Sequence, residues 1–129
     1  MRVLALDHGT VRIGCAISDP SGTLATPLPT IEPPEARTVA ELAAEHGVER
    51  IVVGLPIHLS GEEGSQAALA RTFCSELEAI LDIPIETYDE RLTTKLAAAS
   101  RRGGSRAAED SLAAAHLLET WLTAREARR

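Results

Sequence analysis

The stretch Arg50-Ile51-Val52-Val53-Gly54-Leu55 is apolar over nearly its whole length, and it decides the fold class. An apolar run without alternation is typical of a strand that is buried on both faces. Helical patterns lie on either side of it, over 35–45, which Gly47 ends, and from the capping-box sequence Ser60-Gly61-Glu62-Glu63 to about Leu81. A doubly buried strand between two helices predicts an α/β protein with helices on both faces of its sheet.

The N-terminal quarter of the chain predicts three extended segments, over 3–6, 12–18 and 23–31. The turn sequences His8-Gly9-Thr10 and Asp19-Pro20-Ser21-Gly22 separate them. Strands joined by such short turns form an antiparallel meander. Two prolines inside 23–31 confine this segment to a sheet edge, because proline has no N–H to donate.

The remaining pattern predicts a strand over 83–88, a helix over 92–100, a basic loop over 101–105 and a final helix over 106–125. Right-handed crossovers would place the fourth strand beside the first and the fifth beyond it. We therefore expect a mixed five-stranded sheet, an antiparallel meander plus two parallel strands. The carboxyl ends of the first, fourth and fifth strands would share one edge, where open α/β sheets bind ligands.

Length and composition predict a single domain, residues 1–129. Its net charge of −6 is unfavourable for binding a polyanion, although twelve of the thirteen cations are arginines, which suit phosphate. Two distant cysteines form no CxxC pair and are expected to be small buried hydrophobes. No apolar run has membrane-spanning length, and no signal peptide is evident, so we expect a cytoplasmic protein without membrane contact.

Three carboxylates are candidates for chemistry. Asp7 ends the first strand, Glu90 follows the fifth, and Asp110 lies in the first turns of the last helix. Carboxylates that converge repel each other unless a cation holds them, and oxygen ligands suit Mg²⁺ or Mn²⁺. Two such ions about 4 Å apart could clamp the attacking and leaving oxygens of a phosphodiester. The alternatives are that Asp7 caps a turn, that Glu90 is a surface carboxylate or pairs with Arg91, and that Asp110 is a favourable acid near a helix N-terminus.

Residues near these acids are candidate substrate contacts, through phosphate binding or close approach of the substrate backbone. Turn, ion-pair and strand-exit roles are the alternatives for several of them, and the neighbouring Asp89 is expected to cap a helix rather than to bind metal. The candidates are Thr10, Arg12, Gly54, Pro56, Arg91, Thr93, Thr94, Arg102 and Arg106.

The chain resembles the YqgF/RuvX family of pre-16S rRNA nucleases, which is related to Holliday-junction resolvases. Five strings in order carry the resemblance, which runs from about Val3 to Leu122. They are Leu6-Asp7-His8-Gly9-Thr10, Arg12-Ile13-Gly14-Cys15-Ala16-Ile17-Ser18-Asp19, Val52-Val53-Gly54-Leu55-Pro56, Asp89-Glu90-Arg91-Leu92-Thr93-Thr94 and Asp110-Ser111-Leu112-Ala113-Ala114-Ala115. His8 departs from the aromatic or apolar residue usual in the family, and Arg106 stands where the family usually has Lys.

The resemblance implies an RNase H-like fold and a divalent-metal nuclease, with Asp7, Glu90 and Asp110 at the family's acidic positions. It implies 5′-end processing of pre-16S rRNA in ribosome biogenesis. Resolution of branched DNA is the alternative, and it would require a homodimer to make two coordinated cuts. Single-stranded DNA is a further candidate substrate. Two alternatives belong to other functional classes: a non-catalytic RNA-binding module and a nucleotide-binding ATPase.

Overall fold

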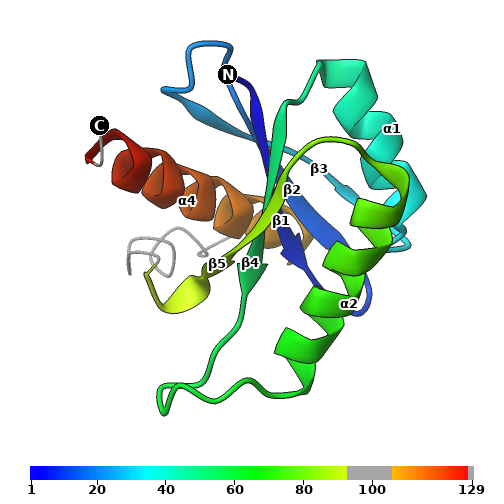
Figure 1. Ribbon diagram of the computed structural model, residues 1–129, viewed down its shortest axis with the longest axis vertical. Coiled ribbons are helices and arrows are strands. Elements are labelled where there is room, and N and C mark those ends of the chain that lie inside the picture. The colour runs from blue at the N-terminus through cyan, green and yellow to red at the C-terminus, as the bar shows by residue number, and fades with distance from the viewer. Residues whose placement is uncertain (93–105, 128–129) are drawn as a thin grey trace.

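The computed structural model describes residues 1–92 and 106–127, with side chains from residue 108 onward in the second segment. Figure 1 shows the elements in place. They are β1 (Val3–His8), β2 (Ile13–Ser18), β3 (Ala25–Ile31), α1 (Ala36–His46), β4 (Arg50–Leu55), α2 (Ser65–Ile80), β5 (Ile85–Asp89), the 3₁₀ turn η1 (Glu90–Leu92) and α4 (Arg106–Ala127).

The five strands form one sheet in the order β3-β2-β1-β4-β5. The pairs β1–β2 and β2–β3 are antiparallel, whereas β1–β4 and β4–β5 are parallel. The expected mixed sheet is therefore confirmed, and so is the position of the proline-bearing β3 at an edge. Since β1, β4 and β5 run in the same direction, their carboxyl ends meet at one edge of the sheet.

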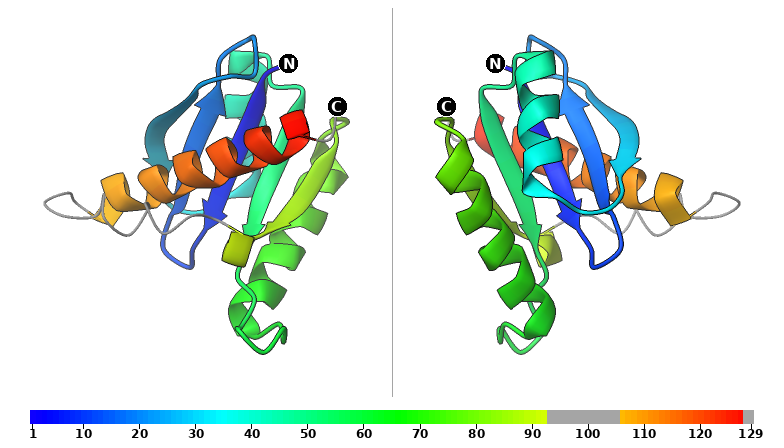
Figure 2. Two further views of the ribbon diagram at one scale, coloured as in Figure 1. Left: turned by 90° about the vertical axis from the view of Figure 1, so that its left-hand side faces the viewer. Right: turned by 90° about the vertical axis from the view of Figure 1, so that its right-hand side faces the viewer.

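Helices cover both faces of the sheet (Figure 2). Helix α4 crosses one face, and α1 and α2 pack together on the other. Side chains of β1 alternate between the two layers: Leu4 and Leu6 belong to the α1–α2 side, and Val3 and Ala5 belong to the α4 side. All four are fully buried, and each leucine contributes about 1.5–3 kcal/mol by leaving water.

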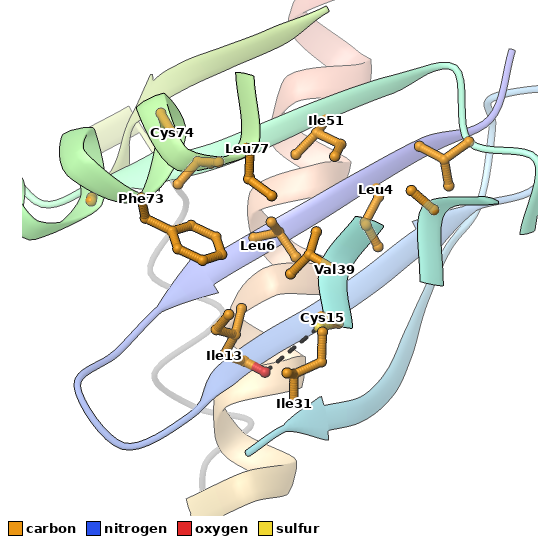
Figure 3. Close-up of a cluster of buried hydrophobic side chains, with 14 of the residues drawn as sticks. Leu4, Leu6, Ile13, Cys15, Ile31, Val39, Ile51, Phe73, Cys74 and Leu77 are labelled. Atoms are coloured by element: carbon orange, nitrogen blue, oxygen red, sulfur yellow. Dashed lines mark hydrogen bonds between the residues drawn. The ribbon is translucent and has the colours of Figure 1, made fainter. Parts of the chain in front are cut away.

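The core beneath α1 and α2 is aliphatic, with one aromatic ring, Phe73, at its margin (Figure 3). The free thiol Cys15 lies in it, with its sulfur 3.6 Å from the backbone oxygen of Ile13. Burial raises the pKa of this thiol to about 12, so it stays neutral. The second thiol, Cys74, is also free and buried, which confirms that both cysteines pack as small hydrophobes.

Helix α1 ends as the sequence predicts, because Gly47 adopts a left-handed conformation with φ of 63° and donates its N–H to the last turn. The expected capping box of α2 is wrong. The helix begins at Ser65 after Gly64, and no side chain caps it. A bridge between Ile57 and Glu63 instead folds the preceding segment back on itself around Gly61.

Strand and helix boundaries otherwise differ from expectation by a few residues. The strand expected over 83–88 is observed as Ile85–Asp89. The helix expected over 92–100 and the basic loop over 101–105 fall outside the described residues, apart from Leu92, which belongs to η1. Within the described ranges, no helix combines the length and the apolar character that crossing a membrane would require.

Candidate nuclease site

Asp7 lies near the carboxyl end of β1, in the middle of the sheet. It is paired with Gly14 of β2, and the preceding residue, Leu6, is paired with Val53 of β4. Because Val3 and Ala5 contact the α4 layer, the alternation of a strand directs Asp7 to this same face. Asp7 is half-buried, and β1 ends one residue later, at the edge of the sheet where the parallel strands end.

Glu90 approaches the same face from the neighbouring strand. It is the first residue of η1, directly after β5, and it lies over Gly54 of β4. A Cβ built at Gly54 would stand 2.6 Å from the Glu90 Oε1 atom and 3.2 Å from Leu117 of α4. The missing side chain of Gly54 thus makes room for Glu90. We expected this glycine to admit the substrate backbone, and that contact stays a prediction.

Asp110 reaches the site from the other side, on the first turns of α4. A Cβ at Gly14 would overlap the backbone carbonyl of Asp110, so α4 rests directly on β2 at this point. The buried Ser111 holds this contact: its Oγ donates to the Leu28 carbonyl at 2.6 Å and accepts from the Cys15 N–H at 3.3 Å. Gly14 was not among the predicted site residues, although a glycine inside an apolar strand does indicate close approach of another segment.

Arg12 forms ion pairs with Asp110 and with Glu32. Its guanidinium is 3.4 Å from the Asp110 carboxylate and 3.5 Å from that of Glu32. These long contacts join the β1–β2 turn to α4 and to the end of β3. The ion-pair alternative for Arg12 is therefore observed, and a phosphate contact stays a prediction.

The structure brings the three acids to one edge and one face of the sheet. Asp7, on β1, lies in the middle, with Glu90 over Gly54 on one side and Asp110 over Gly14 on the other. It does not gather them around one point. Within residues 1–92 and 106–127, no group of three His, Cys, Asp or Glu side chains is close enough to hold a metal ion. The Asp110 carboxylate is paired with the Arg12 guanidinium, at 3.4 Å, which compensates its charge.

Asp89 and Arg91 form a bidentate pair on either side of Glu90. The Asp89 carboxylate accepts hydrogen bonds from Arg91 Nε, at 3.1 and 3.0 Å, and from Nη2, at 2.7 Å. It also accepts the Arg91 backbone N–H at 2.9 Å, which caps the η1 turn as expected. The Arg91 side chain, and to a lesser extent its backbone N–H, lower the pKa of Asp89. A phosphate contact by Arg91 stays a prediction.

His8 lies on the opposite face from the acids. Its ring stacks on Phe73 of α2 with 4.6 Å between the ring centroids. Burial lowers the pKa of His8, although the charge of Glu76 acts in the opposite direction. The structure therefore gives His8 a packing role between β1 and α2, and a histidine next to Asp7 gave no sequence signal for this stacking.

For the other predicted substrate contacts, the structure gives only the position and exposure of the residue, or the residue lies outside the described part of the chain. Thr10 is exposed in the β1–β2 turn, and Pro56 is partly exposed after β4, both at the edge where the acids lie. The side chain of Arg106 is outside the described residues, although its backbone begins α4. Thr93, Thr94 and Arg102 also lie outside them.

The sheet order and the acidic edge define an RNase H-like fold, and solved structures share it. The structure titled "T. thermophilus RuvC in complex with Holliday junction substrate" matches with a TM-score of 0.66 over 98% of this chain and 96% of that chain, at 17% identity. The fowlpox virus Holliday junction resolvase matches with a TM-score of 0.59 over 96% of this chain and 99% of that one, at 9% identity. At these identities the likeness shows the fold alone.

Sequence comparison is more specific. The family model described as "RuvX: Holliday junction resolvase" matches residues 1–124, and the chain belongs to this family. A relative from Chloroflexus aggregans, named "Putative pre-16S rRNA nuclease", is 44% identical over 95% of this chain and 94% of its own length. A relative of the same name from Anaeromyxobacter sp. is 39% identical over 97% and 98% of the two chains. The chain is thus a member of a nuclease family, as its motifs indicated.

Proposed function

We propose that this protein is a divalent-metal-dependent nuclease that hydrolyses phosphodiester bonds in the 5′-end processing of pre-16S rRNA. One observation carries the proposal: the Glu90 carboxylate lies over Gly54, and the α4 backbone at Asp110 lies over Gly14, on the two strands that flank Asp7. Replacing either glycine would displace the acid above it. The space left by Gly54 admits a carboxylate at the edge of the sheet, and the close approach at Gly14 holds Asp110 at the same edge.

The donor set suits Mg²⁺ or Mn²⁺, since all three side chains offer hard carboxylate oxygens. In this proposal Asp7 and Glu90 would hold the metal, and Asp110 would join them in place of its ion pair with Arg12. The bound metal would activate the attacking water and stabilise the leaving oxygen. The substrate contacts would come from the loops at the same edge, which include Thr10 and Pro56.

Arg12 would take a second role in the same exchange. Its guanidinium lies 3.4 Å from Asp110 in the structure and is partly exposed, at 24%. Once released, it could pair with a phosphate oxygen of the substrate, where the planar fork of arginine is favourable. The guanidinium would therefore supply a compensating charge both before and after substrate binds.

The names of the relatives favour pre-16S rRNA as substrate. The description of the family model favours four-way DNA junctions. The second substrate requires a homodimer, because two coordinated cuts are needed to resolve a junction. A cleavage panel of pre-16S rRNA, single-stranded DNA and a four-way junction, with Mg²⁺ and with Mn²⁺, separates these candidates.

The test of the enzyme itself uses Asp7→Asn, which keeps the size of the side chain and removes its charge. We expect cleavage to fall at least about 10²-fold, the scale on which one electrostatic group counts in an active site. Asp82→Asn, at an exposed position between α2 and β5, is the matched control and should cleave like the unmodified chain.

Nucleic-acid affinity, measured in chelator, should stay within about twofold of the unmodified chain for both variants. Cleavage that survives Asp7→Asn would refute the assignment of this site. Binding of RNA without cleavage of any substrate, with either metal, would instead identify a non-catalytic RNA-binding module.

A further inference from the structure

We propose that the Asp89–Arg91 pair positions Glu90 over β4, and that Arg91 acts as a positioning residue rather than as a ligand of substrate phosphate. The inference rests on the proposed function, because it concerns how the acid at position 90 is held. It assigns roles to two side chains that frame Glu90 in sequence and in space.

The first step is the engagement of the Arg91 donors. Nε and Nη2 both bond to the Asp89 carboxylate, and Nη1 donates to the His58 carbonyl at 3.4 Å. All three guanidinium nitrogens therefore already have acceptors within the protein. The Nε–Nη2 edge of the fork, which could bind a phosphate through two bonds, is occupied by the Asp89 carboxylate in charge-assisted bonds, which are among the stronger hydrogen bonds in proteins.

The second step is the direction of the chain. Asp89 ends β5, and its side chain accepts the backbone N–H of Arg91, which closes a tight turn around Glu90. This turn directs Glu90 back over Gly54, where Oε1 lies in the recess of the neighbouring strand. Without the closure, the residues after β5 could leave the sheet in other directions.

The third step is the link to the loop that follows β4. The His58 carbonyl, which Arg91 contacts, also accepts the Gly61 N–H at 2.8 Å, and the His58 N–H donates to the Glu62 carbonyl. The Arg91 side chain thus joins the end of β5 to the folded segment after β4. Glu90 follows the end of β5, and its carboxylate lies over β4. The pair therefore fixes the distance between these two strand ends, which the Glu90 side chain spans.

The test exploits the difference between arginine and lysine. Arg91→Lys keeps the positive charge but loses the fork that binds both oxygens of Asp89. If Arg91 positions Glu90, Arg91→Lys and Arg91→Gln should both weaken Mn²⁺ binding, measured by calorimetry, about 10–100-fold, the usual effect of losing a residue that orients a metal ligand. Asp89→Asn should fall in the same range, and the double variant Asp89→Asn/Arg91→Gln should be no weaker than either single variant.

A matched control exists in the same chain. Arg71 binds Glu63 with the same two-pronged geometry, at 2.6 and 2.7 Å, on the exposed side of α2. Arg71→Gln should leave Mn²⁺ affinity within about twofold of the unmodified chain. Affinity for RNA in chelator should also stay within about twofold in the Arg91 variants, because no phosphate contact is lost.

Two results would overturn the inference. One is Mn²⁺ binding by Arg91→Gln equal to that of the unmodified chain. The other is normal metal binding by Arg91→Lys together with weaker RNA binding by Arg91→Gln, which would make Arg91 a phosphate ligand.

A second readout separates this inference from the proposed function. Hydrogen exchange of the backbone amides at 90–92 should become at least about tenfold faster in Arg91→Gln than in Arg71→Gln. If Glu90→Gln left metal binding and cleavage unchanged, the proposed function would fail, and the exchange result would still decide whether the pair holds the turn. Unchanged exchange would overturn the inference.

Discussion

Gly54→Ala is the sharpest test of the site, because it adds one methyl group directly beneath a carboxylate. The new Cβ would lie 2.6 Å from Glu90 Oε1, and it would lie 3.2 Å from both Glu90 Cγ and Leu117 Cδ2. Ordinary contact begins near 3.4 Å, so the carboxylate oxygen must move away by about 0.8 Å. The two carbon contacts require shifts of only a few tenths of an ångström.

The displacement should cost much more activity than stability. A misplacement of about 1 Å at a reacting group costs about 10²-fold in rate, and we expect a loss in kcat/KM of about 10–10²-fold. The atom most affected is the end of a flexible side chain, so the free energy of unfolding should fall by no more than about 1–3 kcal/mol, the usual range for overpacking. Cleavage assays with Mn²⁺ and urea unfolding measure the two quantities.

Two other glycines provide the comparison. Gly64→Ala produces the same kind of clash, 2.6 Å to the tip of the His58 side chain, and its nearest contacts include none of the three acids, so it should leave cleavage within about twofold. Gly14→Ala meets the backbone of Asp110 instead, so it should destabilise the fold by about 3 kcal/mol or more. Full activity of Gly54→Ala would refute the reasoning that Glu90 must occupy the recess to function.

The remaining predictions concern stability. Ser111→Ala removes the hydroxyl that joins the Leu28 carbonyl and the Cys15 N–H. It should lower the free energy of unfolding, measured in urea, by about 1–3 kcal/mol. A change below about 0.5 kcal/mol, roughly the effect of a surface substitution, would contradict this role. Asp19 has its pKa lowered to about 2 by the Ser21 hydroxyl and by backbone N–H groups. The folded state therefore binds this proton less readily than the unfolded chain, so stability is lost as the pH falls through 3.8 towards 2. Unfolding over this pH range should show a smaller loss in Asp19→Asn, and an equal loss in both proteins would show that the charge does not matter.

The periodicity of the chain predicts its architecture well. The unbroken apolar run at 50–55 predicts a doubly buried strand, and the two prolines of β3 predict its edge position. The burial of β4 and the edge position of β3 both depend on the residue types within one strand. The order of residues along the chain therefore shows them directly. The capping box before α2 failed because the Ile57–Glu63 bridge gave this segment a different set of hydrogen bonds.

The sequence by itself determined the strand order, the common edge and the three acids that lie along it, since strand periodicity and crossover handedness follow from local chirality. Only the tertiary structure decided what each acid contacts. Asp110 meets Arg12 across 98 residues of sequence and also meets Gly14, and Glu90 meets Gly54 across two neighbouring strands. Such contacts depend on the distance between packed elements to a fraction of an ångström, and no pattern along the chain encodes that distance.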